Sequence, residues 1–322
     1  MSDRCAVTIQ NNQSIPRMFI SGCLAGEWVR YDGGQQFHSV LINQMGRLVE
    51  WLPICPEFEA GLGLPREPIQ LEGDPHNPAV RAVVSRRDMT DCLQKWAHEK
   101  GRVLDEVRPW GVVLKSRSPS CGVRDVKVVS VEGTKTRDGV GCFSGWLSES
   151  RPMMPLAQET DLSDFWRWQG FAEWVFIYQR WQRVERESLQ RFHQRHKYQL
   201  MARHAGMAKA LGRVAATAVS HAESIDDYCT LLARMMRLKS SRLRHVNALK
   251  HVAGYLPKKS RERAEAHRAI DHFSLGQRPL ASVQMTLYRL ASQKRLSYLQ
   301  NQYYLKPDPL QLRIQRLGSR KQ

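Results

Sequence analysis

Three cysteines in the first half of the chain lie among small residues, in segments that could hold a metal. Cys23 lies in SGCLAGEWVRYDGG, Cys55 in PICPEFEAGLGLPREP and Cys121 in LKSRSPSCGV. Thiolates are the preferred ligands of iron–sulfur clusters, and glycine lets the backbone approach a bulky inorganic core. These segments contain no CxxC pair. Spacing alone therefore favours structural cysteines first, a zinc or cluster site second and a catalytic thiol third.

Each of these cysteines follows or ends a segment with the composition of a buried strand. The segments are RMFIS (17–21), WLPIC (51–55) and WGVVLKS (110–116), which are short and apolar. In a parallel sheet the carboxyl ends of neighbouring strands meet at one edge, where ligands and catalytic groups collect. We therefore expect the three cysteines to converge, although they are far apart along the chain.

The rest of the first half alternates between strand-like and helix-like segments. AVRAVVS (79–85) and DVKVVSVEG (125–133) predict two further strands, and helical patterns cover 39–50 and 86–107. Strands separated by helix-length segments imply a parallel sheet with crossover helices. The predicted fold of residues 1–160 is therefore α/β, with a Rossmann-like parallel sheet.

The pattern changes within MMPLAQETDLSD (153–164), after which only helices are predicted. The predicted helices are 165–206 (as one or two helices), 207–220, 225–239, 241–255, 259–274 and 279–297. Glycines and prolines such as Gly254 and Pro257 mark the turns between them. The basic tail from 305 onwards predicts partial disorder. We therefore predict an all-α helical domain over 161–322, after an α/β domain over 1–160.

The composition is that of a folded protein without a membrane segment. Of the 322 residues, 42% are hydrophobic and 25% are charged, which is ordinary for a globular protein. No run approaches the ~18 apolar residues that would span a bilayer. The N-terminal MSDRCAVTIQNNQSIPR lacks the apolar core of a signal peptide. The seven scattered cysteines do not form a secreted disulfide framework. We expect a cytoplasmic protein with no membrane partner.

The charge is divided unevenly between the two halves. Residues 1–160 hold 19 Lys and Arg against 19 Asp and Glu, whereas residues 161–322 hold 30 against 12. The whole excess of +18 therefore lies in the second half. Such an asymmetry favours a polyanionic partner for that half, nucleic acid before a membrane surface. The alternative is a basic surface that serves solubility alone.

Basic residues around one predicted helix junction are candidates for RNA contact. Phosphate binding needs Lys and Arg on an accessible face, and a folded RNA is held by shape and phosphate more than by base readout. The candidates are Arg234, Arg237, Lys239, Arg242, Arg244 and Lys250. The segment KKSRER (258–263) adds a second basic cluster. A helical bundle with merely solvated charges is the alternative.

The three cysteine segments together resemble the thiouracil desulfidase family. Its pattern is S-x-C-L-x-G with R-Y-D-G, then C-P-E with G-L-x-x-P-R, then S-P-S-C-G, and all three occur here in order over roughly 16–150. Residues 165–315 resemble the YbgA-type helical domain through FHQRHK, HVAGYL and QYYLKPDPLQLR. This fusion is similar to proteins that remove sulfur from 4-thiouridine in tRNA.

The resemblance implies an iron–sulfur-dependent desulfidase whose substrate is tRNA. It implies that Cys23, Cys55 and Cys121 bind a 4Fe–4S cluster with one open iron, and that Glu57 and Ser118 serve the reaction. The implied reaction is hydrolytic and non-redox, converting 4-thiouridine to uridine with release of sulfide. Glu57 would move protons as a general acid–base, and Ser118 would orient water or the pyrimidine.

Several of these residues also have an ordinary structural interpretation. Glu57 could be a carboxylate at a helix N-terminus, and Ser118 or Ser120 a loop cap. The sequence makes Arg30, Asp32, Arg66 and Ser120 candidate substrate contacts. For the two arginines and Asp32, structural ion pairs are at least as plausible.

The four remaining cysteines lie outside the matching motifs and are expected not to be ligands. They are Cys5, Cys92, Cys142 and Cys229. Among them, Cys142 follows Gly139-Val-Gly, in a loop that could approach the site.

Three alternatives for the function stay open from the sequence. They are desulfuration of free thiouracil or a thionucleoside, a non-catalytic iron–sulfur sensor that binds nucleic acid, and a structural zinc site. The basic second half argues against a free base as the only substrate.

Overall fold

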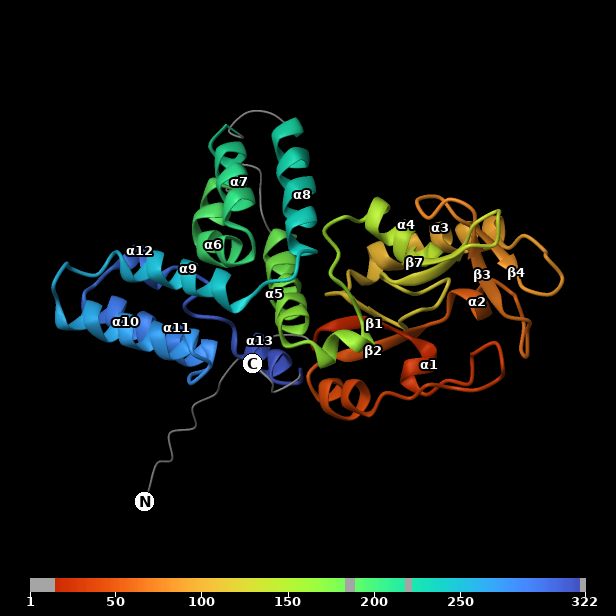
Figure 1. The fold of residues 1–322 in the computed structure, drawn as a ribbon, viewed down its shortest axis with the longest axis horizontal. Helices are drawn as coiled ribbons and strands as arrows, with labels where there is room; N and C mark the ends of the chain where they lie inside the picture. The colour runs from red at the N-terminus through yellow and green to blue at the C-terminus, as the bar shows by residue number, and fades with distance from the viewer. Residues whose placement is uncertain (1–14, 183–188, 218–221, 319–322) are drawn as a thin grey trace, which may run out of the picture.

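The computed structural model describes residues 15–182, 189–217 and 222–318. It consists of an α/β region followed by a helical region (Figure 1). The α/β region confirms the predicted fold class. No helix among the described residues is both long and apolar enough to cross a bilayer.

Sheet A carries the three predicted cysteine-bearing strands. Its strands in spatial order are β2 (Glu50–Ile54), β1 (Arg17–Ser21), β5 (Val112–Leu114) and β8 (Leu156–Gln158). Every neighbouring pair in this sheet is parallel. The predicted strands at 17–21, 51–55 and 110–116 are thereby confirmed, and β8 is a strand that the sequence analysis missed.

The two other predicted strands lie in a second sheet. The strands of sheet B in spatial order are β4 (Ala79–Ala82), β3 (Ile69–Glu72), β6 (Val126–Val129) and β7 (Lys135–Gly139). Its β3–β4 and β6–β7 pairs are antiparallel, and only β3 and β6 run parallel. The prediction that 79–85 and 125–133 extend the parallel sheet was wrong. Each of them pairs with a close neighbour in the chain through a short connection, which permits antiparallel pairing.

Side chains alternate between two hydrophobic layers on the faces of sheet A. In β1, Met18 and Ile20 face one cluster and Phe19 faces the other, because successive side chains of a strand point to opposite faces. The Phe19 side is covered by α3 (Thr90–Val107) and α4 (Cys142–Ser150). The predicted helix at 86–107 is confirmed as α3, whereas 39–50 forms only a π-helical turn and a short 3₁₀ turn over 40–47.

The opposite face of sheet A is covered by two helices from the second half of the chain. Helix α5 (Phe165–Trp181) and helix α13 (Pro309–Gln315) bring Trp168, Phe171 and Ile314 onto the Met18 side. The Trp168 indole donates to the carbonyl of Ile314 at 2.8 Å. The change in element type falls at the predicted boundary near 160, but the hydrophobic cores do not separate there. Part of the tail from 305 is an ordered helix on this core.

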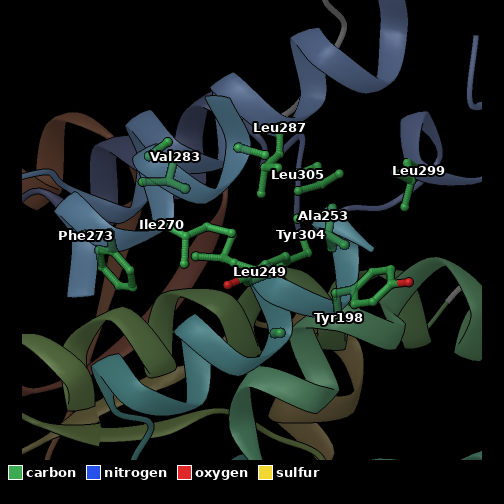
Figure 2. Packing of buried hydrophobic residues seen from close by; sticks show 14 of the residues in the cluster. Tyr198, Leu249, Ala253, Ile270, Phe273, Val283, Leu287, Leu299, Tyr304 and Leu305 are labelled. Carbon is green, nitrogen blue, oxygen red and sulfur yellow. The ribbon is translucent and has the colours of Figure 1, made fainter. Parts of the chain in front are cut away.

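The remaining helices pack in two groups. The first comprises α6 (Leu189–Arg203), α7 (Ala205–Thr217) and α8 (Ala222–Met236), which pack with α5. The second comprises α9 (Arg242–Ala253), α10 (Arg261–Ser274), α11 (Leu280–Gln293) and α12 (Ser297–Gln300). Figure 2 shows the core of the second group, where Tyr198 of α6 joins Leu249, Ile270 and Leu287. The predicted helices of the second half are confirmed, with 165–206 divided into α5 and α6.

Candidate active site

The three predicted ligand cysteines lie at the carboxyl ends of adjacent parallel strands. Cys23 lies in α1 (Gly22–Ala25), which begins directly after β1. Cys55 follows β2 and precedes α2 (Pro56–Glu59), and Cys121 lies in the loop after β5. Because β2, β1 and β5 are neighbours, their ends meet at one edge of sheet A. The predicted convergence is confirmed.

One cavity of about 310 Å³ is lined by all three cysteines. None of the three forms a disulfide. The other predicted site residues that line it are Arg30, Glu57, Arg66, Ser118 and Ser120. The cavity therefore brings together eight of the nine residues that the sequence analysis assigned to the cluster, the catalysis or the substrate.

Burial favours the neutral form of these three thiols. It raises the pKa of Cys23 to about 11, with the nearby Cys55 adding to the shift. Burial also raises the pKa of Cys55 and, more strongly, that of Cys121. The negative charges of thiolates in this cavity would therefore need compensation by a bound cation.

The donor set suits a cluster of several metal ions. Among the described residues, no three His, Cys, Asp or Glu side chains are close enough to share one metal ion. Three free thiols that line one cavity are a donor set that a 4Fe–4S cluster could use. The backbone at Gly122 is also close-packed, since a Cβ there would lie 2.9 Å from the carbonyl oxygen of Ser118.

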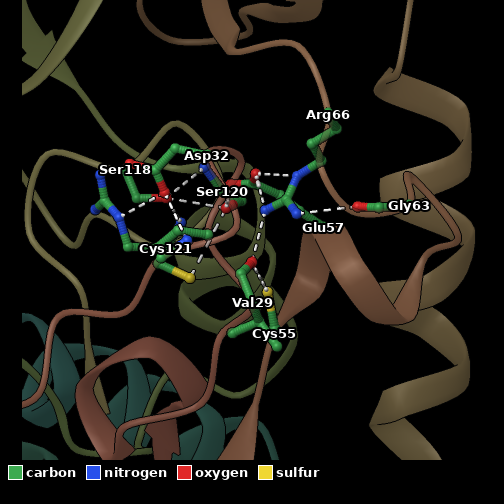
Figure 3. A network of polar contacts seen from close by, with 11 residues as sticks. Val29, Asp32, Cys55, Glu57, Gly63, Arg66, Ser118, Ser120 and Cys121 are labelled. Atoms are coloured by element: carbon green, nitrogen blue, oxygen red, sulfur yellow. Dashed lines mark hydrogen bonds and ion pairs between the residues drawn. The ribbon is translucent and has the colours of Figure 1, made fainter.

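A hydrogen-bonded network connects the predicted catalytic residues with the cysteine loop (Figure 3). Glu57 Oε2 accepts from Arg66 at 2.7 Å, and its Oε1 accepts from the Ser120 hydroxyl at 2.6 Å. Ser120 Oγ lies 3.0 Å from Ser118 Oγ and 3.8 Å from Cys121 Sγ. The Arg66 and Glu57 side chains are only 6% and 13% exposed. The carboxylate is therefore held at the cavity by two donors.

Arg66 also ties the network to the loop after α1. Its guanidinium donates to the carbonyls of Val29 at 3.0 Å and Gly63 at 3.2 Å. The Cys55 thiol lies 3.7 Å from the same Val29 oxygen. For Arg66 the structural ion pair is therefore present, and it sits in the site itself.

Ser118 caps its own loop. Its hydroxyl accepts from the backbone N–H of Cys121 at 3.1 Å and from that of Ser120 at 3.3 Å. Glu57, in turn, lies in the first turn of α2. The structural interpretations of both residues thus hold alongside their position in the cavity.

Asp32 is the one predicted substrate contact that does not line the cavity. Its carboxylate accepts from Arg30 at 3.2 Å and from the N–H of Gly34 at 3.0 Å. The hydrogen bond from Arg30 lowers the pKa of Asp32. Asp32 thereby fixes a turn that holds Arg30, which itself lines the cavity.

The sequence analysis missed a charged group that lines the same cavity. Lys115 and Ser116 line the cavity, and the Lys115 ammonium donates to Glu159 at 2.5 Å. The hydroxyl of Ser116 donates to the same carboxylate at 2.6 Å. The sequence could have indicated Lys115, since this residue directly follows a buried strand.

The N-terminus of α4 supports the loop that carries Cys121. Backbone N–H groups of Gly141, Cys142 and Phe143 donate to the carbonyls of Gly122, Pro119 and Ser120 at 2.8–3.0 Å. The hydroxyl of Ser144 donates to the carbonyl of Cys121 at 2.5 Å. These four consecutive residues bond four of the five carbonyls at 118–122.

The other cysteines do not line the cavity. Cys142 and Cys92 pack against the core of sheet B, and Cys229 packs in the helical region. Burial raises the pKa of Cys142 to about 12. Cys5 lies outside the described residues.

A larger cleft of about 790 Å³ lies between α4, α5 and the end of α8, and none of the three ligand cysteines lines it. Two of the predicted RNA-binding residues do. Arg237 donates there to the carbonyl of Ser148 at 3.1 Å, and Lys239 pairs with Asp164 at 2.5 Å.

Two more of the six RNA-binding candidates bond the backbone of their own region. Arg242 donates to the carbonyl of Phe273 at 3.1 Å, and Arg244 to that of Arg203 at 2.9 Å. Arg234 and Lys250 are exposed and bond no other described side chain. The structure therefore does not gather the six on one free face.

Family models match both halves of the chain. The family model described as 2-thiouracil desulfurase matches residues 18–159, and one described as a protein of unknown function (DUF1722) matches 197–309. A solved structure described as a 4Fe-4S-dependent thiouracil desulfidase, TudS, is 27% identical with a TM-score of 0.39, covering 46% of this chain and 93% of its own.

A curated relative matches the α/β region. The uncharacterized protein YbbK of Bacillus subtilis (strain 168) is 31% identical over 110 residues, which are 33% of this chain and 72% of YbbK. Through its α/β region, the chain belongs to the 2-thiouracil desulfurase family.

Proposed function

We propose that this protein converts 4-thiouridine in tRNA to uridine and releases the sulfur as sulfide. The observation that carries the proposal is one cavity lined by three free thiols and a held carboxylate, in a domain of the desulfurase family. The basic second half of the same chain supports a polyanionic substrate.

We infer that Cys23, Cys55 and Cys121 hold a 4Fe–4S cluster. Three protein thiolates leave one iron without a protein ligand, and a bound cluster would supply there a soft Lewis acid suited to a thiocarbonyl sulfur. The thiols of this chain support the inference because they are free and line one cavity.

We infer that Glu57 moves protons in this reaction. Water adds to the ring carbon that bears sulfur, the carbon–sulfur bond breaks, and a carbonyl oxygen replaces the sulfur without change in oxidation state. Glu57 would take a proton from the water and return one to the departing sulfide or the ring. Arg66 and Ser120 hold its two oxygens, which makes both of them positioning residues.

A thiolated base inside a folded tRNA must leave its stack before it reaches such a cavity, as in enzymes that flip bases. The helical region would hold the RNA through phosphates while the base enters. We place the reaction in the cytoplasm, where a reducing environment keeps such thiols free.

The test is an anaerobic assay of the protein with a reconstituted cluster on bacterial tRNA. We expect the near-ultraviolet absorbance of 4-thiouridine to fall with release of an equal amount of sulfide. Glu57→Gln should keep its iron and lose turnover, whereas Glu50→Gln, an exposed carboxylate outside the cavity, should behave as wild type.

The outcomes separate the remaining functions. Turnover of free thiouracil but not of tRNA would move the substrate to the free base. Binding of tRNA without turnover, unchanged in Glu57→Gln, would indicate a sensor. Zinc in place of iron, without broad visible absorbance, would overturn the cluster.

A further inference from the structure

Exposed aromatic side chains are concentrated in two segments of the first half, the loop after α1 and helix α2. Among the described residues, the exposed Trp, Tyr and Phe side chains are Trp28, Tyr31, Phe37, Phe58 and Tyr255, between 40% and 66% exposed. Trp28, Tyr31 and Phe37 follow Cys23 along the chain, and Phe58 follows Cys55. We call these four residues the aromatic rim.

The rim residues lie in segments that line the cavity of the cysteines. Tyr31 lines the cavity itself. Trp28, Phe37 and Phe58 are each adjacent in the chain to a residue that lines it: Val29, Gln36 and Glu57.

Backbone hydrogen bonds hold the rim segments against the site. The N–H of Gln36 donates to the carbonyl of Cys23 at 2.9 Å, and that of Arg66 to the carbonyl of Tyr31 at 2.9 Å. The Arg30 guanidinium lies 5.4 Å from the centre of the Tyr31 ring, within the range of a cation–π contact. These contacts fix the loop that carries Trp28, Tyr31 and Phe37 relative to the cavity.

The first half has no excess of positive charge to attract RNA. Residues 1–160 are balanced at 19 basic and 19 acidic side chains. Stacking on aromatic rings binds unpaired bases without such charge and without regard to base identity. A free thiouracil would fit within the cavity, so it would make no use of Trp28, Phe37 and Phe58, which do not line it.

We propose that the aromatic rim stacks the nucleobases that flank the thiolated uridine while that uridine enters the cavity. The proposal rests on the proposed function and adds the residues by which the site selects a polynucleotide over a free base. Its occupant is a short unpaired stretch of RNA whose bases meet the rim.

The test compares two substrates with a double variant, Trp28→Ala with Phe37→Ala. Both side chains are exposed, so their removal leaves the cores intact. The matched control is Tyr255→Ala, which removes from the helical half a ring that is as exposed as Phe37. Rates are measured anaerobically on tRNA that contains 4-thiouridine and on the free nucleoside 4-thiouridine.

We expect kcat/KM for tRNA to fall at least about tenfold in the double variant, because each base–aromatic stack contributes a factor of roughly 5 to 150. The value for the free nucleoside should stay unchanged, and Tyr255→Ala should match wild type on both. An equal loss of kcat/KM on both substrates, or no loss on tRNA, would overturn the proposed role of the rim.

A binding measurement separates failure of the rim from failure of the desulfidase function. A short single-stranded oligoribonucleotide should quench the fluorescence of the wild-type protein more than that of Trp28→Phe, whether or not the protein turns over. Equal quenching would overturn the proposal. Sedimentation that shows a dimer dissociated by the double variant would also overturn it, because the rim would then be a protein interface.

Discussion

The two halves of the chain differ in charge and in the aromatic rings that they expose. The first half is electrically balanced, whereas the second carries the whole excess of +18. Four exposed aromatic rings lie in segments that line the cavity of the first half, and Tyr255 is their one counterpart among the described residues of the second. The halves would therefore contact an RNA by different forces, charge in one and stacking in the other. Only the former weakens steeply with salt.

An arginine–glutamate ion pair occurs in both halves, but in different surroundings. In the first half, Arg66 holds Glu57 beside an open cavity. In the second, Arg203 and Glu173 lie 3.4 Å apart with 2% and 4% of their side chains exposed. Burial raises the pKa of Glu173 to about 7 despite the arginine, and lowers the pKa of Arg203. An arginine–glutamate pair therefore belongs to a site where it lines a cavity, and to the protein core where it is fully enclosed.

The largest expected effect separates the chemistry from the RNA binding. Cys121→Ala should lose the visible absorbance of the cluster and all turnover, because it removes one of the three thiolates. Its affinity for tRNA, measured by fluorescence anisotropy, should equal that of wild type. Cys92→Ala, which removes a free thiol outside the cavity, is the control. A parallel loss of tRNA affinity would show that the halves do not act separately.

A pH effect is expected from the buried pair of the second half. Because the folded-state pKa of Glu173 is about 7 and its ordinary value is 4.5, the stability from its neutral form is complete below pH 4.5. It is lost as the pH rises through 7, by up to about 3 kcal/mol. Glu173→Gln should remove this dependence, as measured by urea unfolding at pH 5 and pH 8.

Glu265→Gln is the control for that experiment, since it removes an ion pair with Arg289 in which both side chains are partly exposed to solvent. A pH dependence that persists in Glu173→Gln would assign it to other groups.

Gly141→Ala tests the support of the cysteine loop by α4. A Cβ there would lie 2.7 Å from the backbone N of Gly122 and 2.8 Å from the carbonyl oxygen of Ser120. We expect a loss of about 1–3 kcal/mol in the free energy of unfolding, with faster loss of iron to a chelator. The control is Gly145→Ala within α4. An added Cβ at Gly145 would have no neighbour within 4 Å, so this substitution should be neutral or stabilising. Equal iron retention in both variants would show that the N-terminus of α4 does not support the cysteine loop.

The smallest effect concerns the charge of the second half. Arg234→Gln with Lys250→Gln should weaken tRNA binding and reduce the slope of log K against log salt by about 2, if each contacts one phosphate. Arg137→Gln, an exposed basic residue of the first half, should leave the slope unchanged. An unchanged slope in the double variant would place the RNA on another face.

Local composition was enough to predict the three strands that end at the cysteines, and thus the convergence of Cys23, Cys55 and Cys121. A buried parallel strand is a short apolar run, and its carboxyl end is a known place for ligands. The same reasoning misplaced the strands at 79–85 and 125–133. Which strand pairs with which depends on contacts that no local pattern records.

The sequence by itself determined the α/β and helical regions, the order of the three cysteine segments and the division of charge. Only the tertiary structure decided that α5 and α13 cover sheet A, that Arg66 holds Glu57, and that Gly141 supports the Cys121 loop. It also decided which aromatic rings stay exposed in the segments that line the cavity. The reason is physical: strand and helix periodicity is local, whereas burial and pairing join residues from distant parts of the chain.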